Sequence, residues 1–279
     1  TEVAAYMAKR MPKKGGTFLQ AESEIAAINM IYGVTSAGLR AMTSSSSPGV
    51  SLKQEGISYL AGSALPALIV TVQRGGPGLG GIQPSQSDYF QATKGGGHGD
   101  YRLIVLARAS VQEMADFTAK AFDLSDKYRI PAMILADGTI GQMMEPVVLP
   151  EPCEHHIDKP WAVTGTKGVR EHNIINSLYL VPEELEQTNL ERFERYHAVE
   201  ENEVICEEYL MDDAQYCIVA FGIAARVAKN AITAARAKGV KVGMIRPITL
   251  WPFPKKQIAE AAKKVKAFIS VELSMGQMI

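Results

Sequence analysis

The side chains best suited to chemistry gather in and around a glycine-rich stretch, residues 68–102. The stretch opens with the apolar run 68–72, which predicts a buried strand, and Arg74 follows shortly after it. Two glycine clusters come next, at 75–81 and 95–99. So much glycine costs backbone entropy, and such loops are typical of places where a ligand or another backbone approaches closely. We therefore expect this loop to form one wall of an active site.

Two charged or titratable side chains in this loop are candidate ligand contacts. Arg74 lies at the carboxyl end of the predicted strand, where ligands bind in open α/β sheets. Its guanidinium could form a two-pronged hydrogen-bonded pair with a carboxylate, although an ion pair across an interface explains the position equally well. His98 stands between two glycines and is a candidate proton carrier or hydrogen-bond donor. A lone loop histidine is more often incidental.

Glu24 and a run of serines precede two predicted helices. Glu24 falls in the first turn of its helix, where the helix dipole favours an acidic side chain, so its position alone fits a structural role. Glu22 is expected to face elsewhere. The serines at 44–47 precede Pro48 and Gly49, and hydroxyls in that context are by default helix caps.

Strands and helices alternate along the first half of the sequence. The predicted strands are continuous apolar runs, which in alternation with helices indicate a parallel sheet covered on both faces. We therefore predict an α/β fold. The predicted strands are 17–20, 39–43, 67–72, 103–107 and 131–136, and the predicted helices are 1–9, 25–33, 50–63 and 110–128.

Changes in residue composition along the sequence divide the chain into three parts. Residues 1–150 form the first α/β domain, 151–212 a proline-containing and then strongly charged linker or arm, and 213–279 a second, smaller α/β domain. The charged part of the arm, from residue 182 onward, is predicted to form a solvated helix that packs along one edge. Because the sequence starts at Thr1 on a helical pattern and ends abruptly, we expect it to be trimmed at both ends.

Composition argues against several functional classes. A net charge of -1 gives no sign of a nucleic-acid surface, and no apolar run approaches the roughly 20 residues that span a bilayer. The three cysteines, Cys153, Cys206 and Cys217, are far apart, so we expect reduced thiols, a cytoplasmic protein and no zinc or iron–sulfur centre in this chain.

One motif suggests a dinucleotide site, but its context does not. Gly76, Gly78 and Gly81 satisfy the G-x-G-x-x-G pattern after a strand. A nicotinamide or flavin fingerprint must open directly into a helix, whereas Ile82-Gln83-Pro84-Ser85 follows here. The pattern alone therefore gives little support to a nicotinamide or flavin site.

Four segments together resemble a known family: QAESEIAAI, MTSSSSPGVSLKQEGISYLAG, VQRGGPGLGGIQPSQSDYFQATKGGGHGDYR and ILADGTIGQMMEP. The combination resembles the alpha subunit of the thiamine-diphosphate-dependent 2-oxoacid:ferredoxin oxidoreductases, closest to the 2-oxoisovalerate, or branched-chain, type. The segments FGIAARVAKNAI and RPITLWPFP extend the resemblance through the second domain. It implies a thiamine-diphosphate-binding, pyrimidine-side parallel-sheet domain followed by a transketolase C-terminal-like domain.

The resemblance also implies a reaction, cofactors and partners. The expected enzyme decarboxylates a 2-oxoacid oxidatively with coenzyme A, giving an acyl-CoA, carbon dioxide and reduced ferredoxin. A separate beta subunit is expected to carry the magnesium and diphosphate site, and further subunits the iron–sulfur clusters. By analogy, two such heteromers pair. This chain alone should therefore be catalytically incomplete.

Individual residues take roles from the matching motifs. Glu24 matches the glutamate that touches the pyrimidine ring nitrogen of the cofactor, where a carboxyl helps the cofactor remove its own thiazolium proton. Arg74 matches an arginine near the substrate carboxylate, and we group His98 with it as a substrate contact. Ser46, Ser47 and Gly49 match a loop against the cofactor pocket. The family's tyrosine-proline-isoleucine-threonine-proline segment would lie before Thr1 and is missing.

Two alternatives stay open at this point. A 2-oxoglutarate enzyme shares the same domain but would need a second cationic contact for the distal carboxylate, whereas the apolar Leu79 mildly favours a branched aliphatic substrate. A non-catalytic assembly subunit, whose glycine loop only packs against a partner, would show no response to the cofactor.

Overall fold

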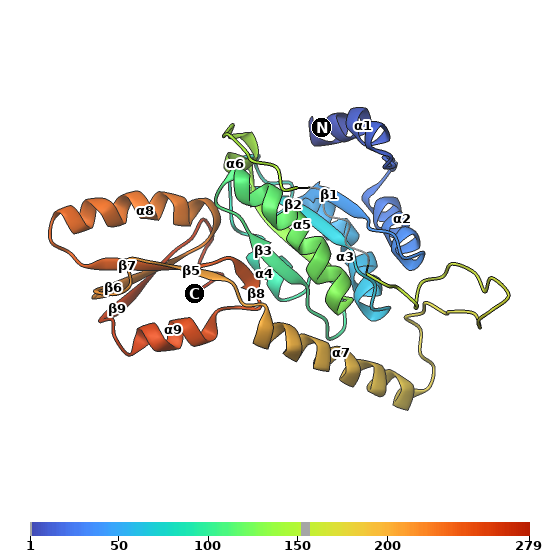
Figure 1. The fold of residues 1–279 in the computed structure, drawn as a ribbon. Coiled ribbons are helices and arrows are strands. Elements are labelled where there is room, and N and C mark those ends of the chain that lie inside the picture. The colour runs from blue at the N-terminus through green and yellow to red at the C-terminus, as the bar shows by residue number, and fades with distance from the viewer. Residues whose placement is uncertain (1, 152–156) are drawn as a thin grey trace.

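The chain folds into two α/β units, each built around its own sheet (Figure 1). The structure is a computed structural model and describes residues 2–151 and 157–279, so Cys153 lies outside the described residues. No helix of the described part is long and apolar enough to cross a membrane.

The first unit contains a five-stranded sheet in the order β1-β2-β4-β3-β8. Its first four strands are parallel, and β8 pairs antiparallel with β3. Strands β2, β3 and β4 are almost entirely buried, which explains their continuous apolar sequence. The strands are β1 Met42–Ser46, β2 Leu68–Gln73, β3 Ile104–Ala107, β4 Ala132–Asp137 and β8 Thr249–Trp251.

The helices of this unit begin where the sequence supplies caps. The hydroxyl of Ser23 accepts a hydrogen bond from Ala26 N at 3.2 Å, and that of Ser110 accepts one from Glu113 N at 3.1 Å. Each bond satisfies a donor that the first helical turn leaves free. The helices are α1 Glu2–Arg10, α2 Glu24–Ser36, α3 Ser47–Gly62, α4 Tyr89–Thr93, α5 Val111–Tyr128 and α6 Gly138–Gln142, with a 3₁₀ turn, η1, at Pro12–Lys14.

A long arm and one helix connect the two units. Between α6 and α7 (Pro182–Asn202) the described residues form no helix or strand. Helix α7 lies along the lower side of the first unit in Figure 1 and buries Tyr196 and Val199. The Tyr196 ring meets the ring of Trp251 edge to face at 5.6 Å. The expected charged helix packing on one edge is therefore present.

The second unit contains a four-stranded sheet in the order β5-β7-β6-β9. Figure 1 shows α8 on one face of this sheet and α9 on the other. An ion pair ties the two units together, because the buried Arg246 of β7 donates to both carboxylate oxygens of Glu113 in α5, at 2.6 and 3.0 Å. The elements are β5 Cys206–Tyr209, β6 Tyr216–Ala220, α8 Gly222–Ala237, β7 Val242–Pro247, α9 Lys255–Ala262 and β9 Ala267–Val271.

Some local predictions differ from the structure, and strand β5, inside the predicted arm, was missed. Residues 17–20 are not a strand, and Leu19 is 72% exposed there, with no neighbouring strand to pair with. Strand β1 begins at Met42, three residues later than predicted, because the serine-rich segment pairs in register with β2. Strand β8 was not predicted: it leaves the second sheet's β7 and returns to the first sheet.

Candidate functional site

The carboxyl ends of β1, β2 and β4 meet at one edge of the first sheet. Ser46 pairs with Val72, and Gln73 pairs with Asp137, so these three strands stop at nearly the same level. Open α/β sheets bind their ligands at this edge. In Figure 1 it is the upper edge of the first unit, where α3 starts directly after β1.

Glu24 faces this edge from the first position of α2. Its carboxyl group is half-buried and makes no hydrogen bond with another described residue. A Cβ added at Gly49 would come within 3.0 Å of Glu24 Oε1 and within 2.1 Å of Ser45 Oγ. Only glycine at position 49 therefore lets the start of α3 lie against Glu24.

Lys53 lies one helical turn beyond Gly49, and the sequence reasoning missed it. The side chain is only 2% exposed, and its Nζ donates to Thr43 Oγ1 at 2.7 Å and to the Ser44 carbonyl at 3.2 Å. Burial lowers the pKa of Lys53, and the charge of Glu24 opposes that shift. The buried ammonium group of Lys53 is therefore close enough to Glu24 to interact electrostatically with its carboxylate.

The signal for Lys53 was present in the helical pattern. In α3 the apolar positions Val50, Ile57 and Leu60 recur at helical spacing, and residue 53 falls on the same stripe. A lysine on a buried stripe is rare unless it is paired, so this position indicated a functional or structural charge.

Arg74 follows β2 and lies beside an acidic group that was also missed. The Ser47 hydroxyl donates to the Asp88 carboxylate and accepts from Arg74 N at 3.1 Å. Burial raises the pKa of Asp88, against the opposing effects of the Ser47 hydrogen bond and the Arg74 charge. The Arg74 side chain makes no hydrogen bond with the described residues, and its Nε is buried without a partner. Its guanidinium is therefore available to a ligand.

The two glycine clusters of the loop make different contacts. Residues 75–81 close on themselves through a hydrogen bond from Gly81 N to the Gly75 carbonyl at 2.8 Å, and Leu79 at the tip is 79% exposed. A Cβ at Gly97 would meet the Gln54 carbonyl at 2.6 Å. The second cluster thus lets the loop pack closely on α3 of the same chain.

The middle of the loop packs against the second unit. Gln86 is buried, and its Nε2 donates to the Phe221 carbonyl at 2.8 Å while its Oε1 accepts from Leu273 N at 2.9 Å. Phe90 N donates to Gln277 Oε1 at 2.9 Å. This segment is therefore held by the C-terminal part of the same chain, and the tip around Leu79 is left free to meet another molecule.

His98 lies apart from the other candidate residues. Its Nδ1 is 3.3 Å from Ser58 Oγ, and its ring stands edge to face with Tyr59 at 6.1 Å. Ser58 lies eleven residues after Ser47 in α3, which corresponds to about 16 Å along a helix. The structure brings Glu24, Ser46, Ser47, Gly49 and Arg74 to one edge and leaves His98 toward the other end of α3, so its substrate role stays a prediction.

The residues at the carboxyl edge fit part of a thiamine-like cofactor site. Glu24 presents a carboxyl group without a hydrogen-bond partner among the described residues, Gly49 lets α3 start directly against it, and the buried Nε of Arg74 lacks a partner. Among the described residues no group of three His, Cys, Asp or Glu side chains could hold a metal ion.

Residues 1–209 match the family model of the thiamine-diphosphate-binding domain of pyruvate flavodoxin/ferredoxin oxidoreductases, and residues 214–279 match pyruvate:ferredoxin oxidoreductase core domain II. The chain belongs to this family. It is an alpha-type subunit of a 2-oxoacid:ferredoxin oxidoreductase, as the resemblance in the sequence predicted.

Relatives of this 2-oxoacid:ferredoxin oxidoreductase subunit carry names with different substrates. The chain is 56% identical over 279 residues to ketoisovalerate oxidoreductase subunit VorB of Methanothermobacter marburgensis, covering all of this chain and 79% of that protein. It is 36% identical over 313 residues to 2-oxoglutarate synthase subunit KorA of the same organism, covering 81% of that protein.

Solved structures agree on the fold. The structure of 2-oxoglutarate:ferredoxin oxidoreductase from Magnetococcus marinus, with 2-oxoglutarate, coenzyme A and succinyl-CoA bound, matches with a TM-score of 0.85 at 29% identity. The match covers 99% of this chain and 54% of that one, so this chain spans about half of that protein. A split-gene transketolase matches at a TM-score of 0.57 and 14% identity, which supports the fold alone.

Proposed function

We propose that this subunit supplies the pyrimidine-side half of a thiamine diphosphate site in an enzyme that oxidatively decarboxylates 2-oxoisovalerate. With coenzyme A the products are an acyl-CoA, carbon dioxide and reduced ferredoxin. The proposal rests mainly on the carboxyl group of Glu24, which has no hydrogen-bond partner among the described residues. It lies against Gly49 at the edge of the sheet where Arg74 also lies. The higher identity to the ketoisovalerate subunit than to the 2-oxoglutarate subunit supports the branched-chain substrate.

Each residue at the edge has a proposed task. Glu24 would hold a proton at the pyrimidine ring nitrogen, Gly49 lets the start of α3 lie against Glu24, and Ser46 ends the strand beside it. Lys53 is proposed to place a buried positive charge near the Glu24 carboxyl group, whose charge acts on the pKa of Lys53. The bound cofactor supplies the nucleophilic carbon and the electron sink for decarboxylation.

Arg74 is proposed to bind the substrate carboxylate. Its guanidinium has no hydrogen-bond partner among the described residues, so it can offer paired N–H groups to a carboxylate without first breaking an internal bond. Ser47 positions the backbone at this point by accepting from Arg74 N. Asp88, which accepts from Ser47, holds the serine hydroxyl in that orientation.

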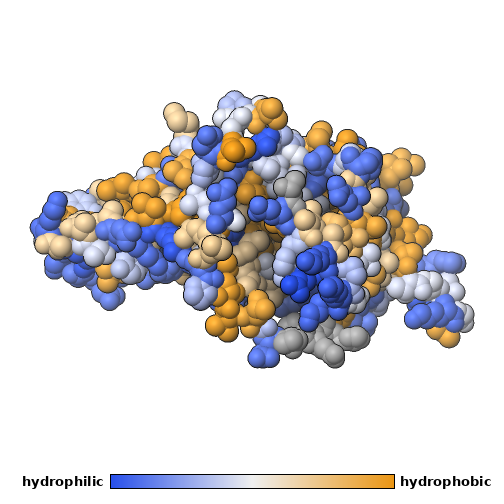
Figure 2. All heavy atoms as spheres, turned by 90° about the horizontal axis from the view of Figure 1, so that it is seen from above, coloured by the Kyte–Doolittle hydropathy of each residue, from blue (hydrophilic) through white to orange (hydrophobic). Residues whose placement is uncertain are grey.

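Partner subunits are proposed to complete the site. Helix α2 is apolar on more than one face, and Ile25, Met30 and Val34 are 53%, 45% and 39% exposed. Figure 2, which views the molecule from above Figure 1, shows hydrophobic residues reaching the surface of the first unit. We assign this surface to a beta subunit that carries magnesium and the cofactor diphosphate.

The assembly and its location follow by analogy. Iron–sulfur subunits would pass electrons to ferredoxin, and the complete enzyme would be a dimer of such heteromers. Cys206 and Cys217 are free thiols, which suits the reducing cytoplasm that we propose for this enzyme.

One observation favours 2-oxoglutarate as a second candidate substrate. Arg108, just after β3, is buried, and its Nε has no hydrogen-bond partner among the described residues. Burial lowers the pKa of Arg108, and the charges of Asp137 and Glu113 oppose that shift. The distal carboxylate of 2-oxoglutarate would need a second cation near this edge, and Arg108 is such a cation. However, Asp137 and Glu113 already compensate the charge of Arg108.

A substrate panel tests the proposed function. The full-length subunit, assembled with its partner chains, is assayed for coenzyme-A-dependent dye reduction with 2-oxoisovalerate, 2-oxoglutarate and pyruvate. We expect the highest kcat/KM with 2-oxoisovalerate. A preference for 2-oxoglutarate would assign the alternative, and activity with none of the three would contradict the proposal.

Cofactor binding separates an enzyme from a non-catalytic assembly subunit. The same complex, freed of cofactor, is heated with and without thiamine diphosphate and magnesium. We expect the cofactor to raise the Tm, since a ligand that binds only the folded state stabilises it. An unchanged Tm at saturating cofactor would favour the assembly subunit.

A further inference from the structure

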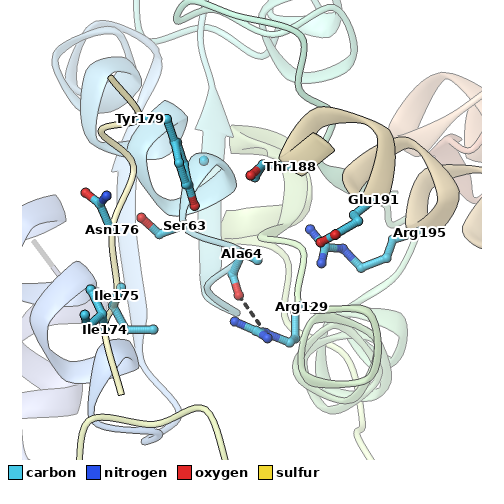
Figure 3. Close-up of a pocket in the computed structure, with 11 residues that line it drawn as sticks. Ser63, Ala64, Arg129, Ile174, Ile175, Asn176, Tyr179, Thr188, Glu191 and Arg195 are labelled. Atoms are coloured by element: carbon cyan, nitrogen blue, oxygen red, sulfur yellow. Dashed lines mark hydrogen bonds between the residues drawn. The ribbon is translucent and has the colours of Figure 1, made fainter. Parts of the chain in front are cut away.

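A polar cavity of about 370 Å³ lies at the opposite, amino-terminal edge of the five-stranded sheet. Figure 3 shows its walls: the turn at Ser63 and Ala64 before β2, Arg129 at the end of α5, the extended arm around Tyr179, and Arg195 on α7. Strand β2 separates this cavity from the Glu24 edge, and its six residues span about 20 Å. The cavity is therefore separate from the catalytic half-site.

Arg195 brings a cation to this cavity without a partner. Its guanidinium makes no hydrogen bond or ion pair within the described part of the chain, and its Nε is shielded from solvent. Burial lowers the pKa of Arg195, and the charge of Arg192 lowers it further, while Tyr196 and Glu191 act in the opposite direction. An unsatisfied guanidinium in such surroundings costs free energy that an anion would recover.

Arg129 brings a second cation from a different element. Its Nε donates to the Ala64 carbonyl at 3.0 Å, the bond drawn in Figure 3, and its guanidinium lies over the Trp161 ring at 4.6 Å. These contacts fix the plane of the group, while its two terminal nitrogens have no partner among the described residues. Burial lowers the pKa of Arg129, and Arg195 adds to the effect, so the two charges repel each other.

The charges around the cavity do not balance. Glu191 is the one carboxylate among the residues that line the cavity, and its Oε1 accepts from Gln187 Nε2 at 3.1 Å. Arg129 and Arg195 line the cavity, and Arg192 lies behind it, donating to the Gly62 carbonyl at 3.1 Å. Two guanidinium groups against one carboxylate leave a net positive charge in the lining, and Arg192 adds a further cation behind it, so the surroundings favour an anion.

We propose that this cavity binds a phosphate group, either free phosphate or the phosphate end of an organic molecule. Fixed guanidinium groups match the geometry of phosphate oxygens, and hydroxyls of Ser63, Thr188 and Tyr179 lie in the same lining. The volume also falls in the range of small-molecule sites, about 300–1,000 Å³, so it can hold more than the phosphate alone. The site does not depend on the function proposed for the other edge.

Binding of labelled inorganic phosphate to the assembled full-length enzyme tests the proposal. Equilibrium dialysis in phosphate-free buffer at constant ionic strength should show saturable binding of one phosphate per copy of this chain. Arg195→Gln and Arg129→Gln should each weaken that binding at least tenfold. Arg236→Gln is the matched control: Arg236 pairs with Asp213 in the second unit at 2.8 Å, and binding should not change.

Two further arms identify the source of the phosphate and guard against misfolding. If adenosine monophosphate displaces the labelled phosphate at a lower concentration than unlabelled phosphate does, the site binds an organic phosphate. If unlabelled phosphate displaces it at the lower concentration, the site binds free phosphate. If Arg195→Gln does not fold, Arg195→Lys keeps the charge but loses the paired donors and should show weakened binding. Absence of saturable binding, or unchanged affinity in the folded Arg195 and Arg129 variants, overturns the proposal.

Discussion

The two edges of the first sheet each hold an arginine without a hydrogen-bond partner among the described residues, but their surroundings differ. At the carboxyl edge Arg74 lies near Asp88, and Glu24 offers a free carboxyl group on an open surface. At the amino edge Arg129 and Arg195 line a cavity that the chain's own arm and α7 enclose. The first edge is thus open, as the proposed contact with another chain requires, whereas the second is a cavity bordered by elements of this chain.

The difference follows from the connections that cross each edge. At the carboxyl edge β1 runs straight into α3, and the loop tip near Leu79 stands in solvent, so the described residues leave Glu24 partly exposed. At the amino edge the arm returns after α6 and α7 packs through Tyr196. An enzyme site shared between subunits needs the open arrangement, and a small-molecule pocket needs the closed one.

The largest effect is expected from Glu24→Gln, which keeps the size of the side chain and removes the carboxyl group. Turnover of the assembled enzyme should fall about 10²- to 10⁴-fold, the usual contribution of a positioned acid or base. Glu22→Gln is the matched control, because Glu22 is exposed and, among the residues that the structure describes, accepts only from the adjacent Ser23 hydroxyl at 3.1 Å. If Glu24→Gln and Glu22→Gln turn over at the same rate, Glu24 has no catalytic role and the site proposed at this edge is wrong.

Arg74→Gln should have the next largest effect. We expect kcat/KM for the 2-oxoacid to fall about 10- to 100-fold, since a hydrogen bond to a charged group contributes about 1.5–3 kcal/mol. Steady-state kinetics across a substrate range measure the change. Arg236→Gln serves as the control, and a kcat/KM that falls equally in both variants would rule out a specific contact with the substrate.

Lys53→Met should change how stability depends on pH. Burial holds the pKa of Lys53 below its usual 10.5, so above the folded pKa and up to 10.5 the unfolded chain binds the extra proton. Wild-type stability then rises with pH in that window, relative to Lys53→Met, by at most about 1.4 kcal/mol per pH unit. Denaturant unfolding at several pH values measures the slope. The exposed Lys263→Met should keep the wild-type slope, and a wild-type slope in Lys53→Met would contradict the effect of burial.

The smallest effect is expected from His98→Gln. His98 lies beside Ser58 and Tyr59, so within this chain it does not reach the Glu24 edge. We expect less than about a threefold change in KM, which corresponds to less than a weak hydrogen bond. A tenfold or larger rise in KM for the 2-oxoacid would restore His98 as a substrate contact.

The sequence predicted most of the fold because its strands and helices carry strong local signals. The apolar runs of β2, β3 and β4 and the stripe of α5 needed no tertiary information. The strand predicted at 17–20 was wrong and β8 was missed, since pairing with a distant strand decides such short segments. The serine-rich strand β1 begins later than predicted for the same reason.

The site shows the same division between local and distant information. Glu24 and Arg74 could be singled out because each stands at the end of a recognisable element. Asp88 and Lys53 could not be placed beside them, because their partners Ser47 and Glu24 lie tens of residues away. His98 is the converse case: closeness in sequence to Arg74 did not bring the two side chains together.

Hydrogen–deuterium exchange of the assembled enzyme, with and without thiamine diphosphate and magnesium, compares the two edges most directly. The account predicts that the cofactor slows amide exchange at the start of α2 around Glu24 and at Ser46 to Gly49. Exchange at Ser63, Ala64 and Arg195 should stay unchanged. Protection confined to the amino edge, or none at Glu24 with cofactor saturating, would contradict the placement of the catalytic half-site.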